Sequence, residues 1–254
     1  MILAWIGAVI VGLSLGLLGS GGSILTVPIL IYLVGQPDKV AIAGSLAIVG
    51  GIALFGAAAY ARRGMVSWRM VWLFGLPGIA GTFGGAIASG EVSGAVQLVV
   101  FAVIMGLASY SMLFPSEARA AHESDSQSLL VLVVSGAGVG LITGFVGVGG
   151  GFLLVPALVI LGSLSMHRAV GTSLAIIVLN SASGFYKHLD LLKGEHSAID
   201  WRIIAIFLVL GVAGNLAGGV LARRIPHQRL RMGFGWFLVV MCVYILWRNV
   251  PRVL

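Results

Sequence analysis

The sequence is poor in charged residues and has almost no cysteine. Only 9% of its 254 residues are charged, whereas 59% are hydrophobic. This composition leaves too little polar surface to cover a soluble globule, so we expect the chain to lie in a lipid bilayer. Cys242 is the single cysteine, which excludes an internal disulfide. Its apolar surroundings indicate a packing role.

Acidic side chains are absent from the apolar segments. Outside a polar stretch at 115–128, they lie at segment edges or in loops: Asp38, Glu91, Asp190, Glu195 and Asp200. Cation channels and proton pumps place carboxylates within the membrane. The sequence therefore disfavours a cation pathway.

The formal net charge of +7 raises the question of a nucleic-acid partner. The arginines instead lie in short loops between apolar segments, which is typical of membrane topology. One loop holds Arg62, Arg63 and Arg69, and another holds Arg223, Arg224, Arg229 and Arg231. We expect no nucleic-acid partner, and we expect both loops to face the cytoplasm from a multi-pass protein of the cell inner membrane.

Hydropathy predicts an all-α polytopic membrane protein. A helix needs about 20 apolar residues to cross the hydrocarbon core. Eight stretches approach that length: 2–18, 41–61, 70–89, 92–114, 129–146, 169–189, 201–222 and 230–248. Two shorter stretches, 24–35 and 152–163, would each cover about half of the membrane.

The chain contains an internal duplication. The run from Gly19 to Pro28 returns 128 residues later, from Gly147 to Pro156, and Ser45 to Ile48 returns at the same offset. Five extra residues then shift the offset to 133, which aligns Trp68 with Trp201. We therefore predict two structural repeats, 1–114 and 129–254, joined by the polar linker 115–128.

The two repeats are expected to be inverted relative to each other. Both basic loops lie on one side only if each half crosses the membrane an odd number of times, as a glycine-broken pair plus three full spans. Inverted duplication with glycine-broken segments at matching positions is typical of secondary transporters.

The two glycine runs are the candidate binding elements. Each glycine costs about 1 kcal/mol in a helix interior, so the helix should open there. The helix that follows then presents free N–H groups at its positive end, which favours an anion. Pro28 and Pro156 are expected in the first turns of these helices. We predict that both N-termini form one anion site near the midplane; alternatively, the glycines only permit tight helix crossing.

A polar stripe on one predicted helix is a second candidate. Ser173, Asn180, Gly184 and Lys187 fall on one face, and Lys187 or His188 would supply positive charge. Their first-repeat counterparts are not polar in the same way: Ile52, Ala59 and Tyr60 match Asn180, Lys187 and His188. Lys187 and His188 alternatively extend to the lipid headgroups, and Asn180 alternatively bonds only to another helix.

Further small and polar residues recur in both repeats. Thr82 and Asn215 match, and each either links helices or lines a cavity. Two glycine sets also match, and we expect both to pack helices closely: Gly78, Gly81 and Gly85 with Gly211, Gly214 and Gly218.

The doubled glycine–proline element resembles the sulfite exporter TauE/SafE family. Each copy is followed by a short segment and then by Gly44-Ser45-Leu46-Ala47 or Gly171-Thr172-Ser173-Leu174-Ala175. The resemblance covers nearly the whole chain and implies transport of sulfur-containing oxyanions. In the second element Val148 replaces the hydroxyl-bearing Ser20 of the first.

The sequence thus predicts a secondary transporter that exports small sulfur-containing oxyanions, such as sulfite or organosulfonates, by alternating access. The candidate substrate-binding residues are Gly19, Ser20, Gly21, Gly22, Ser23, Ser45, Gly147, Gly149, Gly150, Gly151, Thr172, Ser173, Asn180, Lys187 and His188. We expect no catalytic residues, metal or cofactor, and the sequence leaves a homo-oligomer open. The alternatives are an anion channel and an intramembrane hydrolase, with Ser20 as nucleophile and His188 as base.

Overall fold

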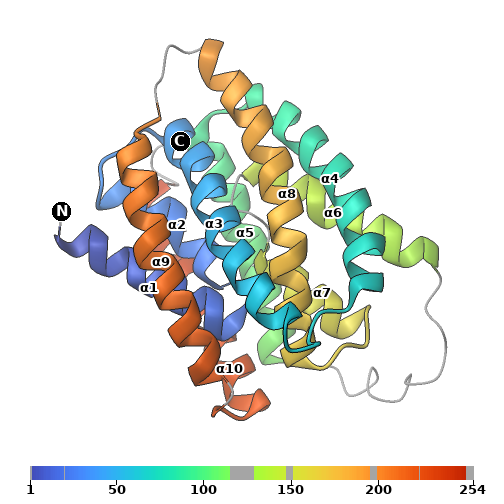
Figure 1. Ribbon diagram of the computed structural model, residues 1–254. Helices are drawn as coiled ribbons and strands as arrows, with labels where there is room; N and C mark the ends of the chain where they lie inside the picture. The colour runs from blue at the N-terminus through green and yellow to red at the C-terminus, as the bar shows by residue number, and fades with distance from the viewer. Residues whose placement is uncertain are drawn as a thin grey trace.

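The computed structural model describes residues 2–19, 21–114, 129–146, 151–194, 199–222 and 224–249, and these form α-helices without strands (Figure 1). The helices are α1 (Ile2–Leu18), α2 (Gly21–Tyr32), α3 (Asp38–Ala61), α4 (Trp68–Gly90), α5 (Gly94–Leu113), α6 (Leu129–Val146), α7 (Gly151–Ile160), α8 (Met166–Gly194), α9 (Trp201–Ala222) and α10 (His227–Asn249). The prediction of an all-α fold is therefore confirmed. The linker 115–128 lies outside the described residues.

Within the described part of the chain, five helices are long and apolar enough to cross a membrane: α3, α4, α6, α8 and α9. Large apolar side chains face outward, for example Leu107, Val209 and Trp247. A soluble protein rarely exposes such surface, whereas lipid covers it readily. The molecule is a multi-pass membrane protein.

Both short helices begin earlier than the sequence suggested. Because α2 begins at Gly21 and α7 at Gly151, Pro28 and Pro156 lie inside these helices. The prediction that they occupy first turns is wrong. A Cβ atom on Gly22 would lie 2.6 Å from Cγ of Leu15, so this glycine lets α2 pack closely on α1. The gain from close packing outweighs a glycine penalty of about 1 kcal/mol.

The first helix of each half packs on the fourth helix of the other half. In the α4–α6 pair, Gly140 lies against the backbone of Gly78, and in the α1–α9 pair Gly12 lies against the backbone of Gly211. These four glycines are related by the offsets of the duplication. In the same way, the contact of Gly81 with Ala137 corresponds to that of Gly214 with Val9. The contact of Gly85 with Leu141 corresponds to that of Gly218 with Leu13. The predicted packing role of both glycine sets is confirmed.

The two long helices α3 and α8 lie side by side in the middle of the molecule (Figure 1). Gly50 of α3 faces Ser181 of α8. Further along α3, Gly56 faces Leu174 and Tyr60 faces Gly171, which lie progressively earlier in α8. The two helices therefore run antiparallel, although they are equivalent in the duplication.

The two basic loops lie at the same end of the bundle. Helices α3 and α9 run parallel, because Gly51 faces Leu208 and Gly56 faces Asn215. Arg62 and Arg224, which follow these two helices, therefore lie at one end. The acidic residues Asp38 and Asp200, which begin or precede them, lie at the other end.

Candidate functional site

The first glycine run contains one clear break in the helix. Gly19 is buried and adopts φ +72°, a left-handed conformation that favours glycine. The hydroxyl of Ser173 on α8 donates to the Gly19 carbonyl over 3.2 Å and to the Val170 carbonyl over 2.9 Å. A Cβ atom on Gly19 would lie 2.8 Å from Cα of Val170. Ser173 and the N-terminal part of α8 thus hold this break in place.

After the break, α2 folds back along α1. Gly22 packs beside Leu15, and Gly7 packs beside Ile29, so the two helices form an antiparallel hairpin. Ser23 is fully buried in the second helix of this hairpin. The first N–H groups of α2 follow directly on the break, where a helix N-terminus is suited to an anion.

Part of the predicted site lies outside the described residues, namely Ser20, Gly147, Gly149 and Gly150. Gly21 and Gly151 are the first residues of α2 and α7. A break at the second glycine run and the contribution of these residues to binding therefore stay predictions.

The C-terminal end of α6, which leads into the second glycine run, is held by side chains from two other helices. His188 on α8 is 2% exposed, and its Nε2 lies 3.1 Å from the Gly144 carbonyl. A carbonyl only accepts hydrogen bonds, so Nε2 carries the proton. Gln97 on α5 donates from Nε2 to the Phe145 carbonyl over 2.8 Å.

A lysine side chain also binds backbone carbonyls at this end of the bundle. Lys39 Nζ donates to the Ser89 carbonyl over 2.6 Å and to the Val92 carbonyl over 2.7 Å. It therefore caps the C-terminus of α4, where a cation is favoured. Sequence reasoning missed both Lys39 and Gln97. The usable signal was that each is a long donor side chain in the first turn of an apolar helix.

The anchor at His188 has an equivalent in the first half. The hydroxyl of Tyr60 donates to the Gly16 carbonyl over 3.5 Å. Tyr60 and Gly16 correspond to His188 and Gly144 at the 128-residue offset. Each glycine run is therefore preceded by a helix whose carbonyl, three residues before the run, accepts a hydrogen bond from the equivalent long helix. The chemistry differs, because only one of the two donors is an imidazole.

The polar stripe on α8 is buried, apart from its lysine. Ser173 and Asn180 are fully buried, and Gly184 lies beside Thr82. Lys187 instead forms an ion pair with Asp190 over 3.2 Å at the partly exposed end of the helix. The structure therefore places His188, and not Lys187, with the buried part of the stripe.

Several polar atoms at the helix crossings have no protein partner within the described chain. Both amide atoms of Asn180 are buried and lack a hydrogen-bond partner, and so do Thr82 Oγ1, Ser181 Oγ and Asn215 Nδ2. Asn180 Oδ1 lies only 2.8 Å from where a Cβ atom on Gly78 would stand. The alternative of a helix-to-helix hydrogen bond at Asn180 is thus not realised in this conformation.

The other hydroxyl candidates have local partners. Ser45 donates to the Ile42 carbonyl over 2.8 Å. Thr172 Oγ1 accepts the Ser67 backbone N–H over 2.9 Å, which ties α8 to the residue preceding α4.

The first break and the described end of α6 lie at different levels of the bundle. Ser173 marks the level of the first break and His188 the level of the α6 end. They are 15 residues apart on α8, or about 22 Å along the helix. One site shared by both breaks stays a prediction, because residues 147–150 lie outside the described residues.

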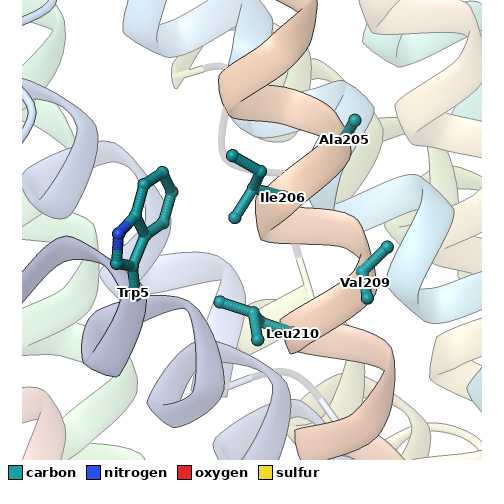
Figure 2. A pocket seen from close by; sticks show the side chains of 5 residues that line it. All are labelled: Trp5, Ala205, Ile206, Val209 and Leu210. Atoms are coloured by element: carbon teal, nitrogen blue, oxygen red, sulfur yellow. The ribbon is translucent and has the colours of Figure 1, made fainter. Parts of the chain in front are cut away.

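An apolar groove of about 530 Å³ lies between α1 and α9, away from these features (Figure 2). Its walls are Trp5, Ala205, Ile206, Val209 and Leu210. The indole N–H of Trp5 is the one polar side-chain group among them, so the groove is unsuited to a desolvated anion. Within the described residues, no group of three or more His, Cys, Asp or Glu side chains could hold a metal ion.

Comparisons with known proteins agree with a transport function. The chain is 34% identical over 247 residues to a probable membrane transporter protein of Xylella fastidiosa (strain 9a5c), covering 94% of this chain and 92% of that protein. It is 28% identical to the probable membrane transporter protein YunE of Bacillus subtilis (strain 168), covering 88% and 90% of the two chains. No solved structure matches the chain. The model of the family described as "Sulfite exporter TauE/SafE" matches residues 4–245, and the chain therefore belongs to the sulfite exporter TauE/SafE family of membrane transporters.

Proposed function

We propose that this protein is a secondary transporter that exports small sulfur-containing oxyanions, such as sulfite or organosulfonates, across the cell inner membrane. The observation that carries the proposal is the break at Gly19, which is buried, anchored by Ser173 and followed at once by the N-terminus of α2. Such a terminus offers backbone N–H groups to an anion without a permanent positive charge. Binding of this kind is readily reversible, as transport requires.

The arrangement of the two halves supports alternating access. The equivalent helices α3 and α8 run antiparallel, as expected for halves of inverted orientation. The basic end of the bundle, with Arg62 and Arg224, is the cytoplasmic end by the positive-inside rule. Gly19 lies near this end, beside Val170, and His188 lies near the opposite end. An exported anion would enter at the first break and leave past the end of α6.

The charge distribution supports an anionic substrate. Within the described residues, no Asp or Glu belongs to α1, α2, α4, α5, α6, α7, α9 or α10. Asp38 lies in the first turn of α3 and Asp190 in the last part of α8, both at the end remote from the basic loops. The interior thus offers hydrogen-bond donors to an anion and places few negative charges near it.

The test is transport by the purified protein in inside-out proteoliposomes. Uptake is measured for sulfite, thiosulfate, sulfoacetate, taurine, sulfate and phosphate, with and without a pH gradient. We expect saturable uptake and counterflow for at least one sulfur oxyanion, and weaker uptake of phosphate. Linear, non-saturating flux without counterflow would identify a channel instead, and the lack of flux for the whole panel would refute the proposal.

A further inference from the structure

We infer that the anion crosses the middle of the protein through the seam between α4 and α8, where Asn180 and Thr82 bind it. This inference rests on the proposed function. The α4–α8 seam is defined here by Gly78 and Thr82 on α4 and by Asn180, Ser183 and Gly184 on α8.

The seam combines small and polar residues in a crossed arrangement. Asn180 faces Gly78, and one turn further along both helices Gly184 faces Thr82. Each polar side chain thus meets a glycine of the opposite helix, and neither finds a hydrogen-bond partner there. Asn180 Nδ2, Asn180 Oδ1 and Thr82 Oγ1 are all buried and unpartnered. Buried polar groups without partners are costly, so their presence points to a ligand that reaches them in another step of the cycle.

The donors of the seam match an oxyanion. The Asn180 amide offers two N–H donors and Thr82 offers one O–H donor, all of them neutral. Ser183 adds a hydroxyl that donates to the Ile79 carbonyl over 3.3 Å in the closed seam. A weakly held anion fits such a set better than a cation, because no carboxylate lies in either helix at this level.

The equivalent seam in the other half is less polar. There Ile52 and Phe55 of α3 stand where α8 has Asn180 and Ser183, and the Ile52 side chain packs against Gly211. Asn215, the counterpart of Thr82, faces Gly56. Although its Nδ2 also lacks a partner, it is the single polar side chain among these three positions. The duplication therefore left one seam suited to an anion and one suited to permanent packing.

The seam lies between the two anchored ends of the molecule. Asn180 lies seven residues from Ser173 at the first break and eight residues from His188 at the α6 end. These separations correspond to about 10 and 12 Å along α8. Asn180 is thus midway between the two anchors.

The single native cysteine makes this inference directly testable. In a Cys242→Ala background, Asn180→Cys and Ile52→Cys form a matched pair, because both positions are fully buried, face a glycine and correspond in the duplication. Thr82→Cys is a second variant with little change in volume. Each is incubated in proteoliposomes with an anionic and with a cationic methanethiosulfonate reagent, and each rate is divided by the rate of the same reagent with free cysteine.

We expect the anionic reagent to modify Asn180→Cys and Thr82→Cys at least about tenfold faster than Ile52→Cys, and faster than the cationic reagent does. Sulfoacetate should slow both reactions. Equal rates at positions 180 and 52, inert thiols at 180 and 82, or a preference for the cationic reagent would overturn the inference. Transport in the anion panel with unreactive 180 and 82 thiols would reject the seam alone, whereas reactive thiols without any transport would reject the proposed function.

Discussion

Replacing Asn180 by isoleucine should stabilise the protein and impair transport. Both amide atoms of Asn180 are buried without a partner, whereas its counterpart in the first half is Ile52, which packs against the equivalent glycine. Removal of an unsatisfied buried polar group is worth about 1–3 kcal/mol. Since about 1 kcal/mol shifts the melting temperature of a chain of this size by roughly 2–4 °C, we expect a rise of about 2–12 °C.

The assay combines thermal unfolding in detergent with transport in proteoliposomes. The Asn180→Ile variant should lose about tenfold or more in kcat/KM, which corresponds to the loss of about 1.4 kcal/mol of binding. The converse variant Ile52→Asn places a second amide in the apolar seam, and it should lower the melting temperature. An unchanged or lower melting temperature for Asn180→Ile, or full transport by it, would refute the reasoning.

Three further pairs of variants test the helix contacts. Gly140→Ala places a Cβ atom 2.7 Å from Cα of Gly78, and this overpacking should lower the free energy of unfolding by about 1–3 kcal/mol in a thermal unfolding measurement. The control Gly138→Ala lies on the same helix and meets nothing within 4 Å, so it should be neutral or slightly stabilising. His188→Gln retains an N–H donor for the Gly144 carbonyl and should unfold near the melting temperature of the native protein. His188→Leu lacks this donor and should lower the free energy of unfolding by about 1–3 kcal/mol. Equal stability of the two variants would contradict the anchoring role of His188. Lys39→Met removes both bonds to the end of α4 and should lower the melting temperature, while Lys39→Arg should restore most of it.

Local patterns in the sequence were sufficient to predict most helices. The bounds of α1, α6 and α9 agree with the predicted 2–18, 129–146 and 201–222, because an apolar run ends where glycine or a polar residue begins. The predictions were less accurate where packing decides. Pro28 was expected at a helix start, but close packing of Gly22 on α1 extends the helix by two turns toward the break.

Two structural features of the candidate site were predicted. The break at Gly19 and the buried stripe with Asn180 followed from residue type and spacing, since these are local properties. Lys39 and Gln97 could have been singled out as long donors in first turns, but their partners Ser89 and Phe145 lie about 50 positions away, and no local pattern identifies such partners. Helix spacing alone also could not decide whether Lys187 or the adjacent His188 turns inward, because neighbouring residues differ by only about 100° around the helix.

The packing of α1 on α9 and of α6 on α4, each across the two halves, has a consequence for biosynthesis. The glycine face of α1 meets its partner, α9, only after about 180 further residues have been added, and α4 likewise awaits α6. Until then, the glycine faces of α1 and α4 in the first half lack their partners, and the equivalent helices of a neighbouring chain of the same kind would fit them. Mutations that slow synthesis of the second half should therefore favour misassembly between nascent chains, while leaving the stability of the finished protein unchanged.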